Sequence, residues 1–397
     1  MATRPTQKEA PPVSIPLYVP SVGELEAANL TECVRQNLLI HGPFVGAFER
    51  GIADFVGTAH AVGTHSGTSA LHLALILAGV GAGDEALITP LTFIAPANAI
   101  RYVGAHPVFI DVEPDTWQMD AELVVNFLKN ECNPRDGGLY NKHTGRRIGA
   151  IVAVHFLGMP VDLDPIMAIA AVHNIPIIED AAQALGTRYR GNRVGSLGMI
   201  GCFSFHGNKL ITAGGGGMIV TNDAGIAKRA RYLANQAKDD PVETSHKEVG
   251  YNYRMTNLHG AVGVAQLTKI NQHIEAKRNI ASVYARDLSK IPGLSLVQEK
   301  PDTFYTYWLS NIVVDAAKFG MTCRELMLSL RQSGIETLPL YEPLHLSLAH
   351  RGSQAVGGKV AETVRKNALS LPSSVGLTEQ DQLSVVDAIQ AAFRSLQ

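Results

Sequence analysis

The sequence predicts an α/β protein: a large domain with a mostly parallel β-sheet covered by helices on both faces, followed by a smaller C-terminal α+β domain. Between residues 61 and 179, short and nearly continuous apolar segments alternate with longer helix-like segments. Parallel strands have this composition because helices cover both faces of their sheet. The length of 397 residues also exceeds what one small core accommodates, which favours two domains.

The elements of the large domain follow from these segments in order. Residues 21–55 have a helical pattern that is interrupted at His41-Gly42-Pro43. Strands are expected at the short apolar runs 61–64, 86–88, 108–111, 148–155, 177–179, 202–205 and 218–220. Helices are expected between the earlier strands, at 69–78, 96–102, 121–129 and 165–173. Residues 130–147 are rich in Gly, Asn and charge, so we expect an inserted surface loop there.

The character of the sequence changes after residue 222. A helix is expected at 224–237, a polar loop at 238–249, and a long helix-permissive segment at 258–288. Short strands and helices are then expected at 308–313, 323–333, 335–338 and 379–395. We therefore expect a loose N-terminal tail at residues 1–15, the large domain at 16–260 and the small domain at 261–397.

The composition excludes several classes of protein. Hydrophobic residues make up 46% and charged residues 18% of the chain, which fits a globular enzyme. The formal net charge of −2 provides no basic field for nucleic acid or anionic lipid. The four cysteines include no CxxC pair, which argues against a zinc site or a disulfide framework. With neither a signal peptide nor an apolar run long enough to span a membrane, we expect a cytoplasmic protein without a metal.

The stretch CFSFHGNKLITAGGGGMIVT, residues 202–221, contains the first candidate for chemistry. Lys209 follows a predicted strand and a turn, and four glycines, 214–217, come after it. A lysine in such a position can form a Schiff base if burial or a nearby positive group keeps it partly neutral. The alternative is a solvated surface lysine beside a flexible loop.

Two further candidates lie at ends of predicted elements. Ser66-Gly67-Thr68-Ser69 falls between a strand and a helix, where backbone N–H groups and hydroxyls can bind a phosphate or simply cap the helix. Glu179-Asp180 ends a strand, at the edge of a parallel sheet where ligands bind. An aspartate there can keep the nitrogen of a pyridoxal phosphate ring protonated, although it can also serve as a helix N-cap.

The remaining candidates are less specific. Phe93 follows a strand and could stack on a flat cofactor ring, but it could equally belong to the core. Asn252 and Arg254 are polar residues among tyrosines, for which loop capping is the alternative. Three histidines, His65, His206 and His345, have no metal-ligand spacing and are interpreted as polar site-wall or core residues.

The order of these features carries more information than any single one. A phosphate-binding turn, an aromatic residue, a strand-end aspartate and a glycine-flanked lysine follow one another on one α/β scaffold, as a pyridoxal phosphate enzyme requires. The chain resembles the DegT/DnrJ/EryC1/StrS family of sugar aminotransferases, which are fold-type I pyridoxal phosphate enzymes. The matching stretches are GTSALHLAL, GDEALITPLTFIAPANAI, PVFIDVEPDTWQMD, EDAAQALG, CFSFHGNKLITAGGGGMIVTND, GYNYRMTNLHGAVGVAQL and, more weakly, YEPLH.

The resemblance implies a role for each matching residue. Lys209 would bond the cofactor and later move the proton between the cofactor and the sugar carbon. Asp180 would pair with the pyridinium nitrogen, Gln183 would meet the ring hydroxyl, and Phe93 would stack on the ring. The phosphate would be held by Gly67, Thr68, Ser69 and Ser204.

The resemblance also implies a homodimer with shared sites, because Asn252 would reach the phosphate of the partner subunit. His345 and Arg254 are the candidates for contacts with the sugar nucleotide. One departure from the family is the glycine run itself, GGGG, in which many relatives carry an acidic residue.

The resemblance is closest to the LegC-like group and implies a ping-pong reaction. L-Glutamate would give its amino group to pyridoxal 5'-phosphate, and the pyridoxamine 5'-phosphate form would pass it to a nucleotide-linked 4-keto-6-deoxy sugar. A UDP-linked 2-acetamido sugar aminated at C4 is favoured, with GDP- or dTDP-linked 4-keto or 3-keto sugars as alternatives. A related sugar 3-dehydratase is disfavoured because those enzymes have histidine at the position of Lys209. A nicotinamide-dependent oxidoreductase is disfavoured because the only glycine fingerprint, residues 79–83, follows a helix.

Overall fold

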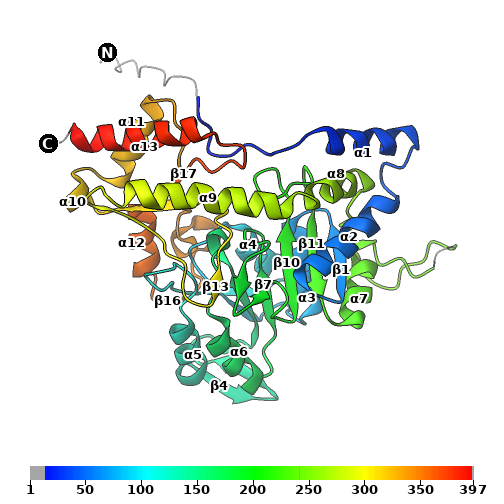
Figure 1. Cartoon of the computed structure of the whole chain (residues 1–397). Helices are drawn as coiled ribbons and strands as arrows, with labels where there is room; N and C mark the ends of the chain where they lie inside the picture. Colours follow the sequence, from blue (N-terminus) through cyan, green and yellow to red (C-terminus); the bar gives the residue numbers. More distant parts are fainter. Residues whose placement is uncertain (1–13, 241, 396–397) are drawn as a thin grey trace, which may run out of the picture.

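The computed structural model describes residues 14–240 and 242–395 (Figure 1). Its strands are β1 His60–Thr64, β2 Glu85–Ile88, β3 His106–Ile110, β4 Cys132–Arg135, β5 Gly138–Asn141, β6 Ile148–Val154, β7 Ile177–Asp180, β8 Arg188–Tyr189, β9 Asn192–Arg193, β10 Ile200–Ser204, β11 Gly217–Thr221, β12 Leu294–Leu296, β13 Thr303–Phe304, β14 Ser310–Val314, β15 Leu338–Pro339, β16 Ala355–Val356 and β17 Ala368–Leu371. Its α-helices are α1 Glu24–Arg35, α2 Pro43–Val56, α3 Gly67–Leu77, α4 Ala95–Tyr102, α5 Ala121–Asn130, α6 Leu163–Val172, α7 Ala224–Ala234, α8 Asn257–Leu267, α9 Ile270–Leu288, α10 Ala316–Phe319, α11 Cys323–Gln332, α12 Lys359–Asn367 and α13 Glu379–Arg394. Within these described residues, no helix has the length and apolar character needed to cross a membrane.

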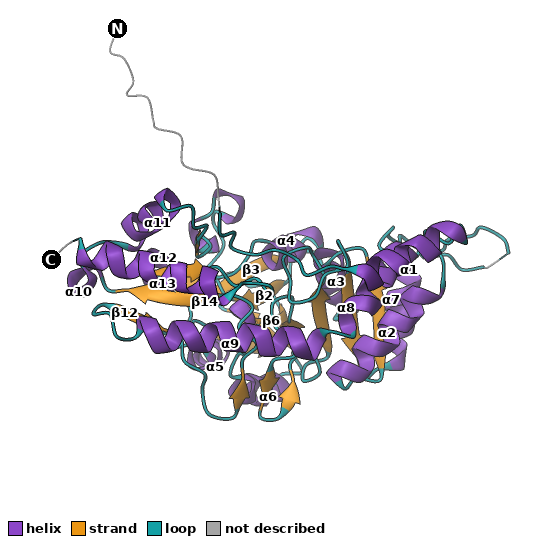
Figure 2. Cartoon of the chain, turned by 45° about the horizontal axis from the view of Figure 1, so that its top comes forward, coloured by secondary structure: helices purple, strands orange, loops and turns teal. Residues whose placement is uncertain are grey.

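The large sheet has eight strands in the order β1-β11-β10-β7-β6-β2-β3-β16. The pairs from β10 to β16 are parallel, and only β11 runs antiparallel to its neighbours β1 and β10. This confirms the predicted mostly parallel sheet of a fold-type I enzyme. Helices pack on both of its faces (Figure 2).

Alternating side chains of the strands enter two separate hydrophobic cores. Leu87, Val108 and Ile151 pack in one core with α2, α5 and α6. Their neighbours Ile88 and Phe109 point to the other face and pack with α3, α4 and α7. Successive side chains of a strand point to opposite faces, so each strand that is covered on both sides needs an unbroken apolar run. That requirement explains the segments from which the fold was predicted.

One expectation about local structure was wrong. Residues 130–147 are not only a loop, because β4 and β5 form an antiparallel hairpin within them. Its two-residue turn is Asp136-Gly137, and both residues have positive φ (51° and 75°), as a type I′ hairpin turn requires. The helix-permissive segment 258–288 forms two helices, since α8 ends at Leu267 and α9 begins at Ile270.

The C-terminal part contains a four-stranded antiparallel sheet in the order β12-β14-β17-β15. Helices α9 and α13 lie beside β12 and β14 (Figure 2), and a third core contains residues of α9, α11 and α13. The chain also returns to the large sheet, where β16 pairs in parallel with β3. We propose that the boundary between the large domain and the small domain lies near residue 260.

The N-terminal segment connects the two regions. Most of the predicted tail, residues 1–13, lies outside the described residues. The backbone N–H groups of Ser14 and Ile15 donate to the carbonyl of Gly334 at 2.8 and 3.1 Å. From there the chain passes to α1, which packs against α8 beside the large sheet (Figure 1).

Candidate active site

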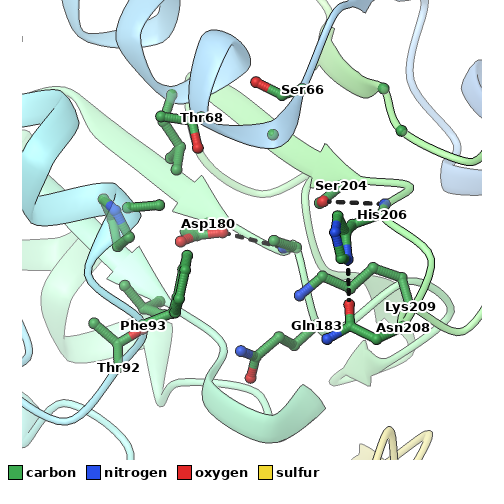
Figure 3. A pocket seen from close by; sticks show the side chains of 18 of the residues that line it. Ser66, Thr68, Thr92, Phe93, Asp180, Gln183, Ser204, His206, Asn208 and Lys209 are labelled. Atoms are coloured by element: carbon green, nitrogen blue, oxygen red, sulfur yellow. Dashed lines mark hydrogen bonds between the residues drawn. The ribbon is translucent and has the colours of Figure 1, made fainter. Parts of the chain in front are cut away.

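A cavity of about 610 Å³ lies where the parallel strands of the large sheet end (Figure 3). Phe93 follows β2, His155 follows β6, Asp180 ends β7 and Ser204 ends β10, and all four line the cavity. Ligands bind at this edge of open α/β sheets because neighbouring parallel strands end there together. In Figure 3, Phe93 and Asp180 lie on one side of the cavity and Lys209 on the other.

The start of α3 forms one wall of the cavity. Ser66 is the N-cap, and its Oγ accepts a hydrogen bond from the backbone N–H of Ser69 at 3.1 Å. The Oγ atoms of Ser66 and Ser69 also lie 2.9 Å apart. Ser69 is therefore used inside the turn and does not line the cavity, whereas Gly67, Thr68 and Ser204 do. The free N–H groups at a helix start attract an anion, so these residues fit a phosphate.

The four glycines at 214–217 allow the chain after Lys209 to approach the turn at the start of α3. A Cβ atom at Gly217 would lie 2.4 Å from the carbonyl carbon and oxygen of Ser66. Gly216 has a φ of 97° and donates its backbone N–H to the carbonyl of His65 at 3.0 Å. A Cβ atom at Gly215 would meet Nε2 of His259 at 3.2 Å. Strand β11 can therefore lie against the turn at the start of α3 only because residue 217 has no side chain.

We expect Gly217→Ala to weaken cofactor retention and to destabilise the fold by about 1–3 kcal/mol, the usual cost of inserting an atom into a packed region. Urea unfolding and cofactor titration measure the two effects. Gly81→Ala is the matched control, because a Cβ atom there meets nothing within 4 Å. Equal behaviour of the two variants would contradict the proposed constraint.

Two adjacent carboxylates at the end of β7 have pKa values shifted in opposite directions. Burial by itself would raise the pKa of Glu179, but the hydrogen bond from His155 and those from the backbone of Gly195 and Gly198 bring it below its ordinary value. His155 accepts the backbone N–H of Val161 at Nδ1 (3.1 Å), so its Nε2 carries the proton donated to Glu179 at 3.0 Å. Glu179 is thus fully engaged and structural.

The carboxylate of Asp180 has fewer hydrogen-bond partners than that of Glu179. Burial raises its pKa, and the backbone N–H of Ala182 (3.1 Å), Lys209 and His155 offset this only in part. A buried carboxylate with one hydrogen bond fits a ligand that offers a cationic N–H group. The ring nitrogen of pyridoxal phosphate is such a group.

Lys209 is partly exposed to the cavity. Burial of its surroundings lowers the pKa of Lys209 to about 8, and the charge of Asp180 partly opposes this. An amine with this pKa is partly neutral near neutral pH, as a nucleophile or a base must be. A Schiff-base lysine must be kept partly neutral by burial or a nearby positive group, and here burial meets that requirement.

Gln183 and Phe93 complete the cavity wall. The side-chain oxygen of Gln183 accepts the backbone N–H of Leu157 at 2.6 Å, which fixes the orientation of the amide. The ring of Phe93 is 52% exposed and lies 5.6 Å from the ring of Tyr341. A flat cofactor ring can therefore stack on Phe93 without displacing core residues. Together with the phosphate turn, Asp180 and Lys209, these groups fit pyridoxal phosphate.

Besides Ser69, three further predicted site residues do not line this cavity in the single chain. Asn252 is exposed and pairs in a β-bridge with Asn235. The guanidinium of Arg254 lies 3.5 Å from Nδ1 of His41. Nε2 of His345 lies 3.3 Å from a carboxylate oxygen of Glu362.

The cavity also contains residues that sequence reasoning missed, namely His155, Asn208, His259 and Tyr341, while His65 and His206 line it as predicted. His155 could have been found, because it directly follows the buried strand β6, and Asp180 was found at the end of the neighbouring strand β7. His259 and Tyr341 come from distant segments and have no such signal. Among residues 14–240 and 242–395, no group of three or more His, Cys, Asp or Glu side chains could hold a metal ion.

The fold and the site together define a fold-type I aminotransferase that uses pyridoxal phosphate. The model of the DegT/DnrJ/EryC1/StrS aminotransferase family matches residues 20–390, and the chain belongs to this family. The chain is 35% identical over 390 residues to "Putative pyridoxal phosphate-dependent aminotransferase EpsN" of Bacillus subtilis, covering 96% of each chain. It is 36% identical over 354 residues to "GDP-perosamine synthase" of Caulobacter vibrioides, covering 88% of this chain and 90% of the relative. The crystal structure of the aminotransferase TlmJ from Streptoalloteichus hindustanus superposes with a TM-score of 0.87 at 29% identity, covering 96% and 99% of the two chains.

Proposed function

We propose that this protein transfers the amino group of L-glutamate to C4 of a nucleotide-linked 4-keto-6-deoxy sugar. The single observation that carries the proposal is the cavity in which Asp180 and Lys209 are brought together with the phosphate-binding start of α3. When bound, pyridoxal phosphate would act as the electron sink for the exchange of the amino group. The two half-reactions would follow one another in the same cavity, so the kinetics should be ping-pong.

The residues of the chain would divide the remaining work. Lys209 would bond the cofactor at rest and then, as a free base, move a proton between cofactor and substrate carbons. Asp180 would keep the ring nitrogen protonated, and Gln183 would contact the ring hydroxyl. Thr68, Ser204 and the backbone of Gly67 would hold the phosphate, with Phe93 against the ring.

Two nucleotide forms of the substrate have support. The LegC-like resemblance of the sequence favours a UDP-linked 2-acetamido-4-keto-2,6-dideoxy sugar, made in the cytoplasm for surface polysaccharide. The relative named GDP-perosamine synthase, 36% identical over most of the chain, favours a GDP-linked sugar. A related sugar 3-dehydratase is disfavoured because position 209 holds lysine, where those enzymes have histidine.

A substrate panel tests the proposal directly. Purified enzyme is incubated with glutamate and UDP-, GDP- or dTDP-linked 4-keto and 3-keto sugars, and products are identified by mass and NMR. We expect a 4-amino sugar and stoichiometric 2-oxoglutarate from a 4-keto substrate. Amination of none of these sugars, with glutamate conversion intact, would refute the proposed substrate class.

We propose further that the working unit is a homodimer in which Asn252 reaches the partner's cofactor phosphate. Its exposure and its absence from the cavity of its own chain are consistent with this role. Leu39 and Ile40 are 44% and 57% exposed beside the start of α8, and a second copy of the chain would cover such apolar side chains.

Asn252→Ala is expected to weaken cofactor binding about 10- to 100-fold, because a hydrogen bond to a charged group contributes about 1.5–3 kcal/mol. Equilibrium dialysis against pyridoxal phosphate measures the loss. Asn271→Ala, on the exposed surface of α9, is the control and should bind normally. In mixed dimers, Asn252→Ala paired with Lys209→Ala should contain at most one intact site. Unchanged retention by Asn252→Ala would contradict a shared site.

A further inference from the structure

Trp308 connects the small C-terminal region to the lysine loop. It is one of only two tryptophans in the chain and is 2% exposed. It lies just before β14 and packs in a core with Phe156 and Leu157, and the backbone N–H of Leu157 donates to the side-chain oxygen of Gln183. Trp308 is therefore close to the cofactor residues although it does not line the cavity.

Trp308 makes two separate contacts with the loop that carries Lys209. The indole N–H donates to the backbone carbonyl of Asn208 at 2.6 Å. The amine of Lys209 lies 4.6 Å from the centre of the indole ring, within the range of a cation–π interaction. The hydrogen bond fixes the backbone of the loop at Asn208, and the ring face lies against the side-chain nitrogen of Lys209.

Trp308 is in turn held in place by a buried lysine. The amine of Lys277, on α9, donates to the carbonyl of Trp308 at 2.9 Å and to that of Ser373. The side chain of Lys277 is only 4% exposed, and both of these partners are uncharged. Burial lowers the pKa of Lys277 to about 7. A lysine is expensive to bury in this way, so the carbonyl of Trp308 is anchored at some cost to the fold.

We propose that Trp308 is a positioning residue for Lys209. Its ring face holds the amine of Lys209, and its indole N–H holds the backbone carbonyl of Asn208. This inference rests on the proposed role of Lys209. The ring face favours the charged form of the amine, so it opposes the effect of burial and keeps part of the amine protonated. The other ionisable groups that line the cavity are Asp180, His65, His155, His206, His259 and Tyr341. The alternative is that Trp308 only fills space in its core.

The test measures Lys209 in the full chain after cofactor removal, so it does not depend on the sugar. Competitive acetylation across pH, read by mass spectrometry, gives the pKa of the Lys209 amine. Trp308→Phe and Trp308→Met both lack the indole N–H and leave similar voids, but only phenylalanine retains a π face. We expect the pKa of Lys209 to be lower in the methionine variant than in the phenylalanine variant by about 0.4–1.5 units. Equal values would overturn the role of the ring face.

Hydrogen exchange tests the second contact. The amide of Lys209 donates to the carbonyl of His206 at 2.9 Å, and loss of the indole hydrogen bond should speed its exchange about 2- to 10-fold in both variants. Trp117→Phe is the control, because Trp117 is 3% exposed in the same core. Exchange no faster than in this control would overturn the role of the indole N–H. Lys209→Ala separately tests whether Lys209 is the reactive lysine.

Discussion

Lys209→Ala is expected to abolish the yellow absorbance of bound cofactor and to reduce transamination by more than about 10²–10⁴-fold. A positioned acid–base group by itself contributes about 10²–10⁴-fold. The loss should be larger here, because the variant also lacks the amine that would bond the cofactor. Among the residues that the structure describes, Lys209 is the only lysine or arginine that lines the cavity, so no other amine of the same chain is placed to substitute for it. Absorption spectra and single-turnover assays with glutamate measure both losses.

Lys228→Ala is the matched control. This lysine is exposed on α7 and should leave colour and rate unchanged. If Lys209→Ala retained normal turnover while Lys228→Ala did too, the assignment of Lys209 would be wrong. Loss of turnover with normal secondary structure by circular dichroism would support it.

The second large effect is expected for Asp180→Asn, which keeps the size of the side chain and the acceptor for the backbone N–H of Ala182. Without the carboxylate, the ring nitrogen loses its anionic partner, and we expect turnover to fall by about 10²–10³-fold, the usual cost of removing one preorganised electrostatic group. Steady-state assays at saturating cofactor separate this loss from weakened binding. Asp302→Asn, at an exposed site, should have the normal rate.

The same substitution is expected to stabilise the cofactor-free protein at neutral pH. Because burial raises the pKa of Asp180 above its ordinary value of 3.8, the folded state binds this proton more tightly than the unfolded chain. The free energy of unfolding then decreases as pH rises from about 3.8 to the raised value, and the loss persists at pH 7. Asparagine removes this loss, so the stability advantage of Asp180→Asn should grow between pH 4 and pH 7 in urea unfolding. An advantage that is constant with pH would contradict the raised pKa.

The large sheet and the site residues on it could be predicted because both follow from short-range rules. Unbroken apolar runs mark strands that are buried on both faces, and the residues that follow such runs lie at one edge of the sheet. Phe93 and Asp180 were found in this way, whereas Ser204 was assigned only from the family resemblance. The same rule applied to residues 148–154 would have added His155.

Other features depend on contacts that no local pattern encodes. Tyr341 and Trp308 reach the site from the small region, and their positions depend on how that region packs. The hairpin at residues 132–141 was missed although Asp136-Gly137 is a favoured turn pair, because the strands beside it, CNPR and GLYN, are short and mostly polar. Ser69 was assigned to the phosphate from the family resemblance, but the helix cap uses its backbone N–H, and its side chain does not line the cavity.

The pairing of β16 with β3 has a consequence for biosynthesis. The two residues that complete this edge of the large sheet, Ala355 and Val356, follow β3 by more than 240 positions. During translation the outer edge of β3 therefore stays unpaired until residue 356 has left the ribosome. An unpaired edge can recruit other strands, so the nascent chain is open to aggregation at this edge until residues 355–356 have paired with β3.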